Sequence, residues 1–364
     1  MIAQILVACG IVYNLLAVAG ALRFRRRATV PAFTPPVSIL KPVRGRDAQF
    51  YDAIRSHAEQ LYPEFEILFG VADPADPAHI DIARLQREYP GVAIRVIATA
   101  NDAPNQKVGS LEILAREAKY DALLVNDGDI LVDADYLARV MSLLEDDNTG
   151  LVTCLYRGRG ASLPARAEAL GIATEFAPSV LVARLLSSSG FALGATMAFR
   201  RRELGAIGGF ASIREFLADD YQLGARISAL GKRVAMADTV VETNLGSGAW
   251  QDVWKHLVRW SRTLRVSRPG GYVGYGITQA TVWCVLAALL GHTGIAVVGL
   301  IVRLTAAHFA LRALGQSGAM QLAAVPVRDL FGFAVWCAGL AGNEVEWRGS
   351  RFRLREDGRI EPLC

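Results

Sequence analysis

The 364-residue sequence predicts an α/β fold with apolar segments at both ends: a mainly parallel β-sheet flanked by helices, one N-terminal transmembrane helix and a C-terminal hydrophobic helical block. Three observations support this prediction. Short β-branched apolar segments alternate with helix-like segments between residues 37 and 125, the pattern of a parallel sheet covered on both faces. Residues 2–22 are almost continuously apolar, and a second apolar region covers residues 272–314.

The composition agrees with a water-exposed domain joined to membrane segments. Apolar residues make up 52% of the chain and the mean hydropathy is +0.28, whereas 20% of the residues are charged, too many for a purely intramembrane protein. The net charge is only +4, and no Lys/Arg block resembles a nucleic-acid-binding stripe, so no nucleic-acid partner is expected. The five cysteines show no pairing or metal-ligand spacing, which is typical of small buried residues in a reducing compartment.

The N-terminal apolar segment has about the ~20 residues that cross a bilayer. Its positive charge follows it, at residues 23–27, whereas a cleavable leader, the alternative reading, carries charge before the apolar run. The positive-inside rule therefore places the N-terminus outside and the next domain in the cytoplasm. The expected division is an anchor, a cytoplasmic domain, C-terminal transmembrane or interfacial helices and a basic tail, at residues 1–24, 35–268, 269–345 and 346–364.

The C-terminal hydrophobic block is too long for a single membrane span. A glycine-containing break at residues 291–294 predicts a helical hairpin within residues 272–314. A third apolar stretch, residues 325–340, begins beside Arg328 and Asp329, which are costly in lipid. An interfacial or re-entrant position would account for these charges. The sequence leaves open the number of crossings and the side on which the tail lies.

Acidic residues directly follow two of the predicted strands. The strands are residues 37–40, 65–71, 92–97 and 122–125, and the helices that follow the first three are residues 49–60, 78–88 and 108–118. Asp73 and Asp76 follow the second strand, and Asp127 and Asp129 follow the fourth. Because open parallel sheets bind ligands beyond the carboxyl ends of their strands, these carboxylates are expected at one edge of the sheet.

Asp127-Gly128-Asp129 is a candidate metal site. Two carboxylates around a glycine suit a hard divalent cation, Mn²⁺ or Mg²⁺, which takes its other ligands from water and substrate phosphates. An ordinary acidic turn is the alternative. Asp73 lies between a strand end and Pro74, in a loop that leaves its carboxylate free to bind a nucleotide base or ribose, with an Asx turn as the alternative.

Two further groups carry candidate chemistry. Asp219 and Asp220 begin a predicted helix, and adjacent carboxylates raise one pKa, which suits a general base that deprotonates a hydroxyl group; helix capping is the alternative. His256, Arg259 and Trp260 share one helix face and could receive a departing diphosphate. An amphipathic interfacial helix is the alternative for this second group.

Taken in order, these features resemble the ceramide glucosyltransferase family (glycosyltransferase family 21-like) and its bacterial relatives that glycosylate hopanoid lipids. The resemblance covers nearly the whole chain. It implies a GT-A fold and an inverting, metal-dependent transfer of a hexose from a UDP-sugar, with UDP-glucose expected, to the hydroxyl of a membrane lipid. It also implies a multi-pass protein whose catalytic domain faces the cytoplasm, in a bacterial inner membrane.

The resemblance assigns a role to each candidate residue. The nucleotide lies near Asp73, the metal and diphosphate bind Asp127 and Asp129, the catalytic base is Asp220, and the closing motif is Arg259-Trp260. Lys107 ends a segment, residues 105–107, that also resembles the family and is expected at the donor site. The chain departs from the family at His256, where Gln or Arg is usual, and at Gly128, where Ser is common.

Several alternatives stay open at this point. Ceramide and a hopanoid such as bacteriohopanetetrol are both possible acceptors, the latter with N-acetylglucosamine as the sugar. A processive polysaccharide synthase has similar motifs but needs more membrane helices than the three or four candidates here. A non-catalytic lipid-binding protein would be expected to lack at least one of the carboxylates, and none is missing.

Overall fold

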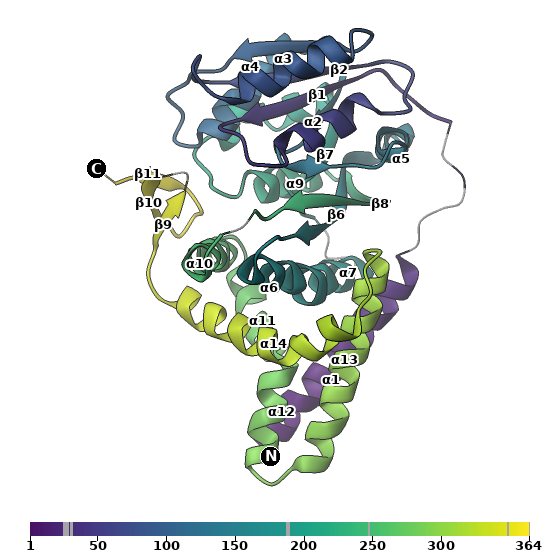
Figure 1. Ribbon diagram of the computed structural model, residues 1–364. Coiled ribbons are helices and arrows are strands. Elements are labelled where there is room, and N and C mark those ends of the chain that lie inside the picture. The colour runs from purple at the N-terminus through teal and green to yellow at the C-terminus, as the bar shows by residue number, and fades with distance from the viewer. Residues whose placement is uncertain (25–28, 30–31, 187–189, 247, 348, 364) are drawn as a thin grey trace.

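A computed structural model describes residues 1–24, 29, 32–186, 190–246, 248–347 and 349–363, so residues 25–27 of the predicted basic cluster lie outside the described part. The molecule has an α/β domain from which a group of helices projects (Figure 1). The predicted α/β class with a mainly parallel sheet, flanking helices and apolar helices at both ends is confirmed.

Within the described residues, eight strands form the main sheet in the order β3-β2-β1-β4-β7-β6-β8-β5. The first four strands are all parallel to one another, in the order β3-β2-β1-β4. Strand β6 is parallel to β8, whereas β7 and β5 are antiparallel to the strands beside them. The strands are β1 (Val37–Val43), β2 (Phe65–Val71), β3 (Ala93–Ala98), β4 (Ala122–Val125), β5 (Ile130–Leu131), β6 (Thr149–Arg159), β7 (Met197–Arg200) and β8 (Arg233–Asn244).

Strand β1 runs three residues beyond its predicted end and includes Pro42. Proline has no N–H to donate to a neighbouring strand and is tolerated where pairing has stopped. The pairing of β1 with β4 ends at Leu40, which lies opposite Val125, so the β4 side of Pro42 needs no donor. The strand can therefore continue beside β2 alone.

Helices cover both faces of the sheet because neighbouring strand residues point to opposite sides. On one face Ile39 and Ile67 pack in a cluster with helices α2 and α3, and on the other Leu40 and Leu68 pack in a cluster with α4 and α9. The helices of the domain are α2 (Phe50–Ala58), α3 (Ala78–Glu88), α4 (Gln106–Glu117), α5 (Tyr136–Met141), α6 (Leu163–Gly171), α7 (Ala177–Leu185), α8 (Arg201–Ala206), α9 (Asp219–Ala229) and α10 (Trp250–Ser267).

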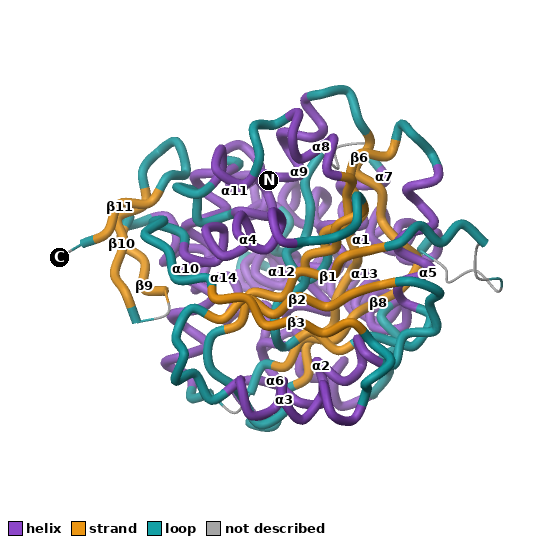
Figure 2. Tube along the Cα trace, turned by 90° about the horizontal axis from the view of Figure 1, so that it is seen from above, coloured by secondary structure: helices purple, strands orange, loops and turns teal. Residues whose placement is uncertain are grey.

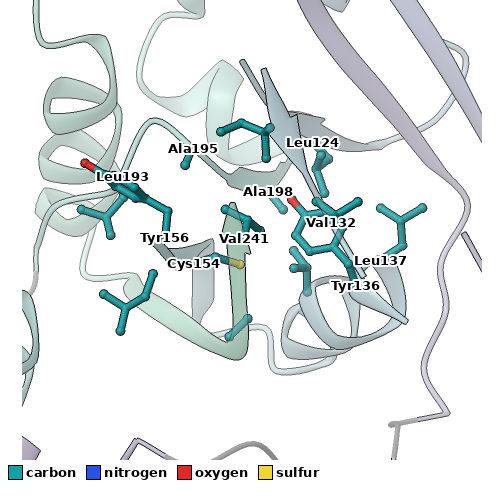
Figure 3. Close-up of a cluster of buried hydrophobic side chains, with 14 of the residues drawn as sticks. Leu124, Val132, Tyr136, Leu137, Cys154, Tyr156, Leu193, Ala195, Ala198 and Val241 are labelled. Carbon is teal, nitrogen blue, oxygen red and sulfur yellow. The ribbon is translucent and has the colours of Figure 1, made fainter. Parts of the chain in front are cut away.

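Figure 3 shows part of the first cluster, in which Leu124, Ala198, Cys154 and Val241 come from four successive strands, β4, β7, β6 and β8. Cys154 is completely buried there, and Cys284 is buried too, whereas Cys9 and Cys337 are exposed, so the prediction of buried cysteines is wrong for these two. Burial raises the pKa of the Cys154 thiol to about 12, so it acts as a small apolar residue.

A short π-helical segment, Ile172–Phe176, joins α6 to α7. Such segments insert an extra residue into a helix and change the direction of the side chains that follow. Here two consecutive residues contact different neighbours. Glu175 pairs with Arg328 of α14 (Ala319–Leu340) at 3.2 Å, whereas the Phe176 ring lies 6.2 Å from that of Trp260 in α10.

The apolar helices are α1 (Ile2–Arg23), α11 (Pro269–Ile277), α12 (Ala280–Leu289), α13 (Thr293–Ala313) and α14 (Ala319–Leu340). By length and composition α1, α13 and α14 could each cross a membrane, and so could the pair α11 and α12, which is bent by 44°. The break between α12 and α13 falls at residues 290–292, which confirms the predicted hairpin. A Cβ on Gly10 of α1 would lie only 3.1 Å from that of Ala280, so glycine permits close helix packing.

Helix α14 runs across the others rather than alongside them. In Figure 1, α1, α12 and α13 lie side by side, and α14 crosses between them and the α/β domain. Its charged residues are paired: Arg303 of α13 donates two hydrogen bonds to Asp329, at 2.7 and 2.9 Å. Pairing lowers the cost of burying these charges. An interfacial or re-entrant position for this stretch stays a prediction.

The end of the chain returns to the α/β domain and forms a small antiparallel sheet, which we call the C-terminal sheet. It consists of β9 (Glu344–Trp347), β10 (Ser350–Leu354) and β11 (Ile360–Pro362), in the order β11-β10-β9. Figure 2 shows it at the edge of the molecule, beside α10. The sequence predicted only a basic tail here, and this sheet places the tail on the same side of the apolar helices as the main sheet.

Candidate active site

The Asp127-Gly128-Asp129 loop is fixed by the residue that precedes it. Asn126 directly follows β4 and is completely buried. Its amide nitrogen donates to the Ala195 carbonyl at 2.7 Å and to the Tyr136 hydroxyl at 3.0 Å. A Cβ on Gly128 would meet the Phe50 ring at 3.5 Å and Val43 at 3.8 Å, both ordinary contacts. The serine that is common at this position in the family would therefore fit.

Lys107 brings the loop together with the start of α9. Its Nζ lies 2.9 Å from Asp127 Oδ1 and 3.2 Å from Asp219 Oδ2, and its side chain is only 8% exposed. Asn105 caps the helix that carries Lys107, since its side chain accepts a hydrogen bond from the Val108 N–H. Burial opposes the positive charge, but Asp127 and Asp219 outweigh it and raise the pKa of Lys107 above its usual value.

Asp129 has the environment of a cation ligand. Burial and the nearby Asp127 raise the pKa of its carboxyl group, and Thr243 donates a hydrogen bond to its Oδ2 at 2.5 Å. Two carboxylates with incomplete charge compensation suit a hard cation. No cluster of three or more His, Cys, Asp or Glu side chains that could hold a metal is found in the described part of the chain. Asp127 and Asp129 therefore fit a cation that takes its remaining ligands from substrate and water.

A buried Lys41–His57 pair lies beneath the loop, and the sequence analysis missed it. Lys41 Nζ donates to the Asp127 carbonyl at 3.0 Å and lies 3.4 Å from His57 Nε2. Burial lowers the pKa of Lys41 to about 7, and burial together with Lys41 lowers that of His57. A lysine inside an otherwise apolar central strand was the signal that could have revealed the pair.

Asp220 is held in place by backbone N–H groups. Gly194 N–H donates to Oδ2 at 2.9 Å and Tyr221 N–H donates to Oδ1 at 2.7 Å. A Cβ on residue 194 would lie 3.2 Å from Oδ2, so glycine leaves space for the carboxylate. Burial and Asp219 raise the pKa of Asp220 to about 6, with Lys107 acting in the opposite direction. A carboxylate with this pKa can accept a proton near neutral pH.

His256, Arg259 and Trp260 lie on α10, as predicted. His256 Nδ1 is 2.6 Å from Glu168 Oε1, and its ring meets that of Trp260 edge to face at 4.7 Å. The sequence analysis did not identify Glu168, which is buried on α6, 88 residues away. Since one ring nitrogen of His256 is engaged by a carboxylate, the ring orientation is set by Glu168.

Tyr156 is a buried residue of β6 close to the candidate residues. Its ring is 5.1 Å from Phe176, which in turn contacts Trp260. Burial raises the pKa of its hydroxyl well above the usual value, and the charges of Asp220, Glu168, Asp127 and Asp129 raise it further. Tyr156 is therefore close to carboxylates from α6, from α9 and from the loop after β4.

Asp73 stands apart from this group. It is exposed, and its Oδ1 accepts a hydrogen bond from the Ala75 N–H at 2.8 Å, the Asx turn that was the alternative reading. It follows β2, which β1 separates from β4. Asp76 is structural, since its carboxylate accepts hydrogen bonds from Gly45 and Ala78 N–H groups. A nucleotide-binding role for Asp73 stays a prediction.

The open, mainly parallel sheet with helices on both faces is a GT-A-like fold, and the protein is a glycosyltransferase. The chain belongs to glycosyl transferase family 21, whose model matches residues 2–360.

Known proteins agree with this assignment. Ceramide glucosyltransferase 3 of Caenorhabditis elegans is 21% identical over 364 residues, covering 93% of this chain and 77% of the worm protein. The ceramide glucosyltransferase of Komagataella phaffii is 31% identical over 131 residues, which are 34% of this chain and only 25% of the yeast protein. The apolar helices and these relatives indicate a membrane protein.

A solved structure supports the fold. The mannosyltransferase PcManGT from Pyrobaculum calidifontis, in complex with GDP-Man and Mn²⁺, aligns with a TM-score of 0.57 and 19% identity, covering 93% of this chain and 96% of its own. The similarity extends over the apolar helices as well as the sheet, because it includes nearly all of both chains.

Proposed function

We propose that the protein transfers a hexose from a UDP-sugar to the hydroxyl of a membrane lipid, with inversion at the anomeric carbon and with a divalent cation. The arrangement around Lys107 carries this proposal. One buried ammonium group pairs with Asp127 of the candidate metal loop and with Asp219, the neighbour of Asp220. Donor binding and proton acceptance would thus be positioned by the same side chain.

The chemistry follows from the residues present. Asp127 and Asp129 would hold Mn²⁺ or Mg²⁺, which neutralises the diphosphate of the donor. Asp220 accepts the proton of the lipid hydroxyl as its oxygen bonds to the anomeric carbon. The bond from that carbon to the diphosphate breaks on the opposite side, which inverts the configuration. A carboxylate with a pKa of about 6 suits this step, since it is ionised at neutral pH yet still basic.

The α10 residues would bind the departing diphosphate. Arg259 supplies a permanent positive charge, and the neighbouring Trp260 packs against Phe176. His256, oriented by Glu168, would add a hydrogen bond donor from its other ring nitrogen. In the same proposal Lys107 contributes to the donor site, and Asp73 contacts the nucleoside.

Glucose and ceramide are the proposed donor sugar and acceptor. The named relatives are ceramide glucosyltransferases. Helix α14, which crosses beside the α/β domain in Figure 1, carries exposed apolar side chains, Val327 and Leu330 among them. A hopanoid polyol with UDP-N-acetylglucosamine is the second combination to test. A processive polysaccharide synthase is disfavoured, since the described helices offer three candidate spans, or up to four if the bent pair is one span.

The proposed location is a membrane, in bacteria the inner membrane, with several crossings and the 35–268 domain on the cytoplasmic face. Arg23 ends α1 on the side of the α/β domain, as the positive-inside rule requires for a cytoplasmic domain. The acceptor then reaches the site by diffusion within the bilayer. Confining both reactants to one surface raises their effective concentration.

The test is a transfer assay with the purified full chain in lipid nanodiscs. The nanodiscs contain ceramide or bacteriohopanetetrol, and radiolabelled UDP-glucose or UDP-N-acetylglucosamine is added with Mn²⁺. We expect glucosylceramide to form, and the Asp220→Asn variant to bind the donor without turnover. Product in another combination would replace the donor or acceptor named here. No product in any combination and no binding of either donor would overturn the proposed function.

A further inference from the structure

The C-terminal sheet contacts two parts of the active site that are far apart in the sequence. One is residues 215–217, which lead into α9 and the proposed base Asp220. The other is α10, which carries Arg259 and Trp260. The roles of these residues are those of the proposed function, on which the inference rests.

The contact with residues 215–217 is made through the backbone and a buried cluster. The Ile360 N–H donates to the Glu215 carbonyl at 2.8 Å, and Arg359 pairs as an antiparallel bridge with Phe216. Leu217 packs against the apolar core of the C-terminal sheet, which consists of Val345, Phe352, Leu354 and Ile360. Asp219 and Asp220 follow within three residues, so a shift of this segment would move the carboxylates.

The contact with α10 is made mainly by arginines that bind carbonyl groups. Arg262 donates to the Ala341 carbonyl at 3.0 Å and to the Glu344 carbonyl at 2.5 Å, and Arg265 donates to the Gly342 carbonyl at 2.6 Å. Val266 of α10 packs against the same apolar cluster as Leu217. One small core thus joins the segment before the base to the helix of the diphosphate-binding residues.

Residues 214–217 are also held by hydrogen bonds from Asn105, the residue that caps α4. The Asn105 N–H donates to the Arg214 carbonyl at 3.0 Å, and its side-chain amide donates to the Phe216 carbonyl at 2.8 Å. The helix that Asn105 caps also carries Lys107, which pairs with Asp127 and Asp219. The segment is therefore held from the metal side by α4 and from the α10 side by the C-terminal sheet.

We infer that the C-terminal sheet sets the position of Asp220 relative to Arg259 and Trp260, and that Phe352 and Ile360 are positioning residues for the transfer reaction. The base and the diphosphate-binding group act at opposite sides of the reacting carbon. Their separation must be held closely, since a displacement of about 1 Å can cost 10²-fold in rate. Donor binding depends on the loop after β4 and on the first half of α10. That half packs against Val335 of α14 through Val253, Leu257 and Val258, away from the C-terminal sheet, so donor binding should change little.

The test uses the full chain in nanodiscs and compares Phe352→Ala and Ile360→Pro with the wild type. Phe352→Ala weakens the apolar cluster, and Ile360→Pro removes the N–H that binds Glu215. We expect kcat to fall at least tenfold, the KM for the UDP-sugar to stay within threefold, and amide hydrogen exchange in residues 214–217 to rise at least tenfold. Phe352→Leu should restore most of the activity.

Arg353→Ala is the matched control, because Arg353 lies on β10 but is exposed between the buried Phe352 and Leu354. It should leave kcat and exchange unchanged. An unchanged kcat in both test variants would overturn the inference, as would reduced kcat without faster exchange in residues 214–217. Absence of sugar transfer by the wild type would instead count against the proposed function, and unchanged exchange in the variants would then overturn the link separately.

Discussion

The backbone N–H of Gly194 donates a hydrogen bond to Oδ2 of Asp220 at 2.9 Å. This bond stabilises the ionised carboxylate, yet burial and the adjacent Asp219 still raise the pKa of Asp220 to about 6. The group is therefore able to act as a base in the physiological range, and its neighbours suggest the following tests.

The first prediction concerns Asp220 itself. Asp220→Asn should lower kcat by about 10²–10⁴-fold, the range that a general base contributes, because the amide cannot accept the proton. The UDP-sugar dissociation constant, measured by calorimetry, should be unchanged within threefold. Loss of donor binding in this variant would instead assign Asp220 to the donor site.

The second prediction concerns pH. The base works in its ionised form, so kcat should fall about tenfold for each pH unit below about 6 and level off above pH 7. The measurement is kcat between pH 5 and 8 at saturating donor, lipid and Mn²⁺. A profile that stays flat down to pH 5 would contradict the environment described for Asp220.

The third prediction concerns Lys107. Lys107→Met leaves the buried Asp219 without its cation, which should lower the free energy of unfolding by on the order of 3 kcal/mol and reduce donor affinity. Thermal unfolding and donor calorimetry measure the two effects. Lys119→Met is the control, because Lys119 is 66% exposed and its pair with Glu64 spans 3.9 Å. Equal effects of the two substitutions would rule out a special role for Lys107.

The fourth prediction concerns the cation. Thr243 donates to Asp129 Oδ2, and residues that orient a metal ligand typically contribute about 10–100-fold to metal affinity. Thr243→Val should therefore raise the Mn²⁺ concentration for half-maximal activity about tenfold, whereas Thr243→Ser retains the hydroxyl and should match the wild type. Chelation with EDTA should abolish transfer, and Mn²⁺ should restore it. Full activity of the chelated protein would exclude a metal requirement.

The fifth prediction concerns the junction between the apolar helices and the catalytic domain. Arg303 and Asp329 are both buried and form two hydrogen bonds. Either Arg303→Leu or Asp329→Leu alone should lower stability by about 3–5 kcal/mol, since one charge is left buried without its partner. The double substitution should recover most of this loss. Thermal unfolding in nanodiscs measures it, and a double variant no more stable than the singles would argue against the pair.

The local parts of the fold were accessible from the sequence. The bounds of β2, α3 and β4 match the predictions because their apolar patterns and flanking turn residues are local signals. Strands β6 and β8 were not identified, and they pair with each other across about 80 residues. The C-terminal sheet was missed for a similar reason, since its short strands depend on α10 and residues 215–217 for their packing.

The candidate site likewise contains residues with local sequence signals and residues that only distant contacts reveal. Asp127, Asp129 and Asp220 were proposed because each belongs to a short motif beside a strand or at a helix start, and Lys107 because its segment resembles the family. The structure places Lys107 in contact with Asp127. Thr243 and Glu168 were not identified. They lie 114 and 88 residues from Asp129 and His256, the groups that they bind, and only the tertiary fold brings them together.

The π-helical segment constrains how the chain can change length. Glu175 faces Arg328 of α14 and Phe176 faces Trp260 of α10, although the two residues are consecutive. Each residue in an α-helix turns the next by about 100°. Removing one residue between α6 and α7 would rotate α7 by that angle and turn one of these contacts away. Insertions and deletions should therefore be selected against here, even where individual side chains are free to vary.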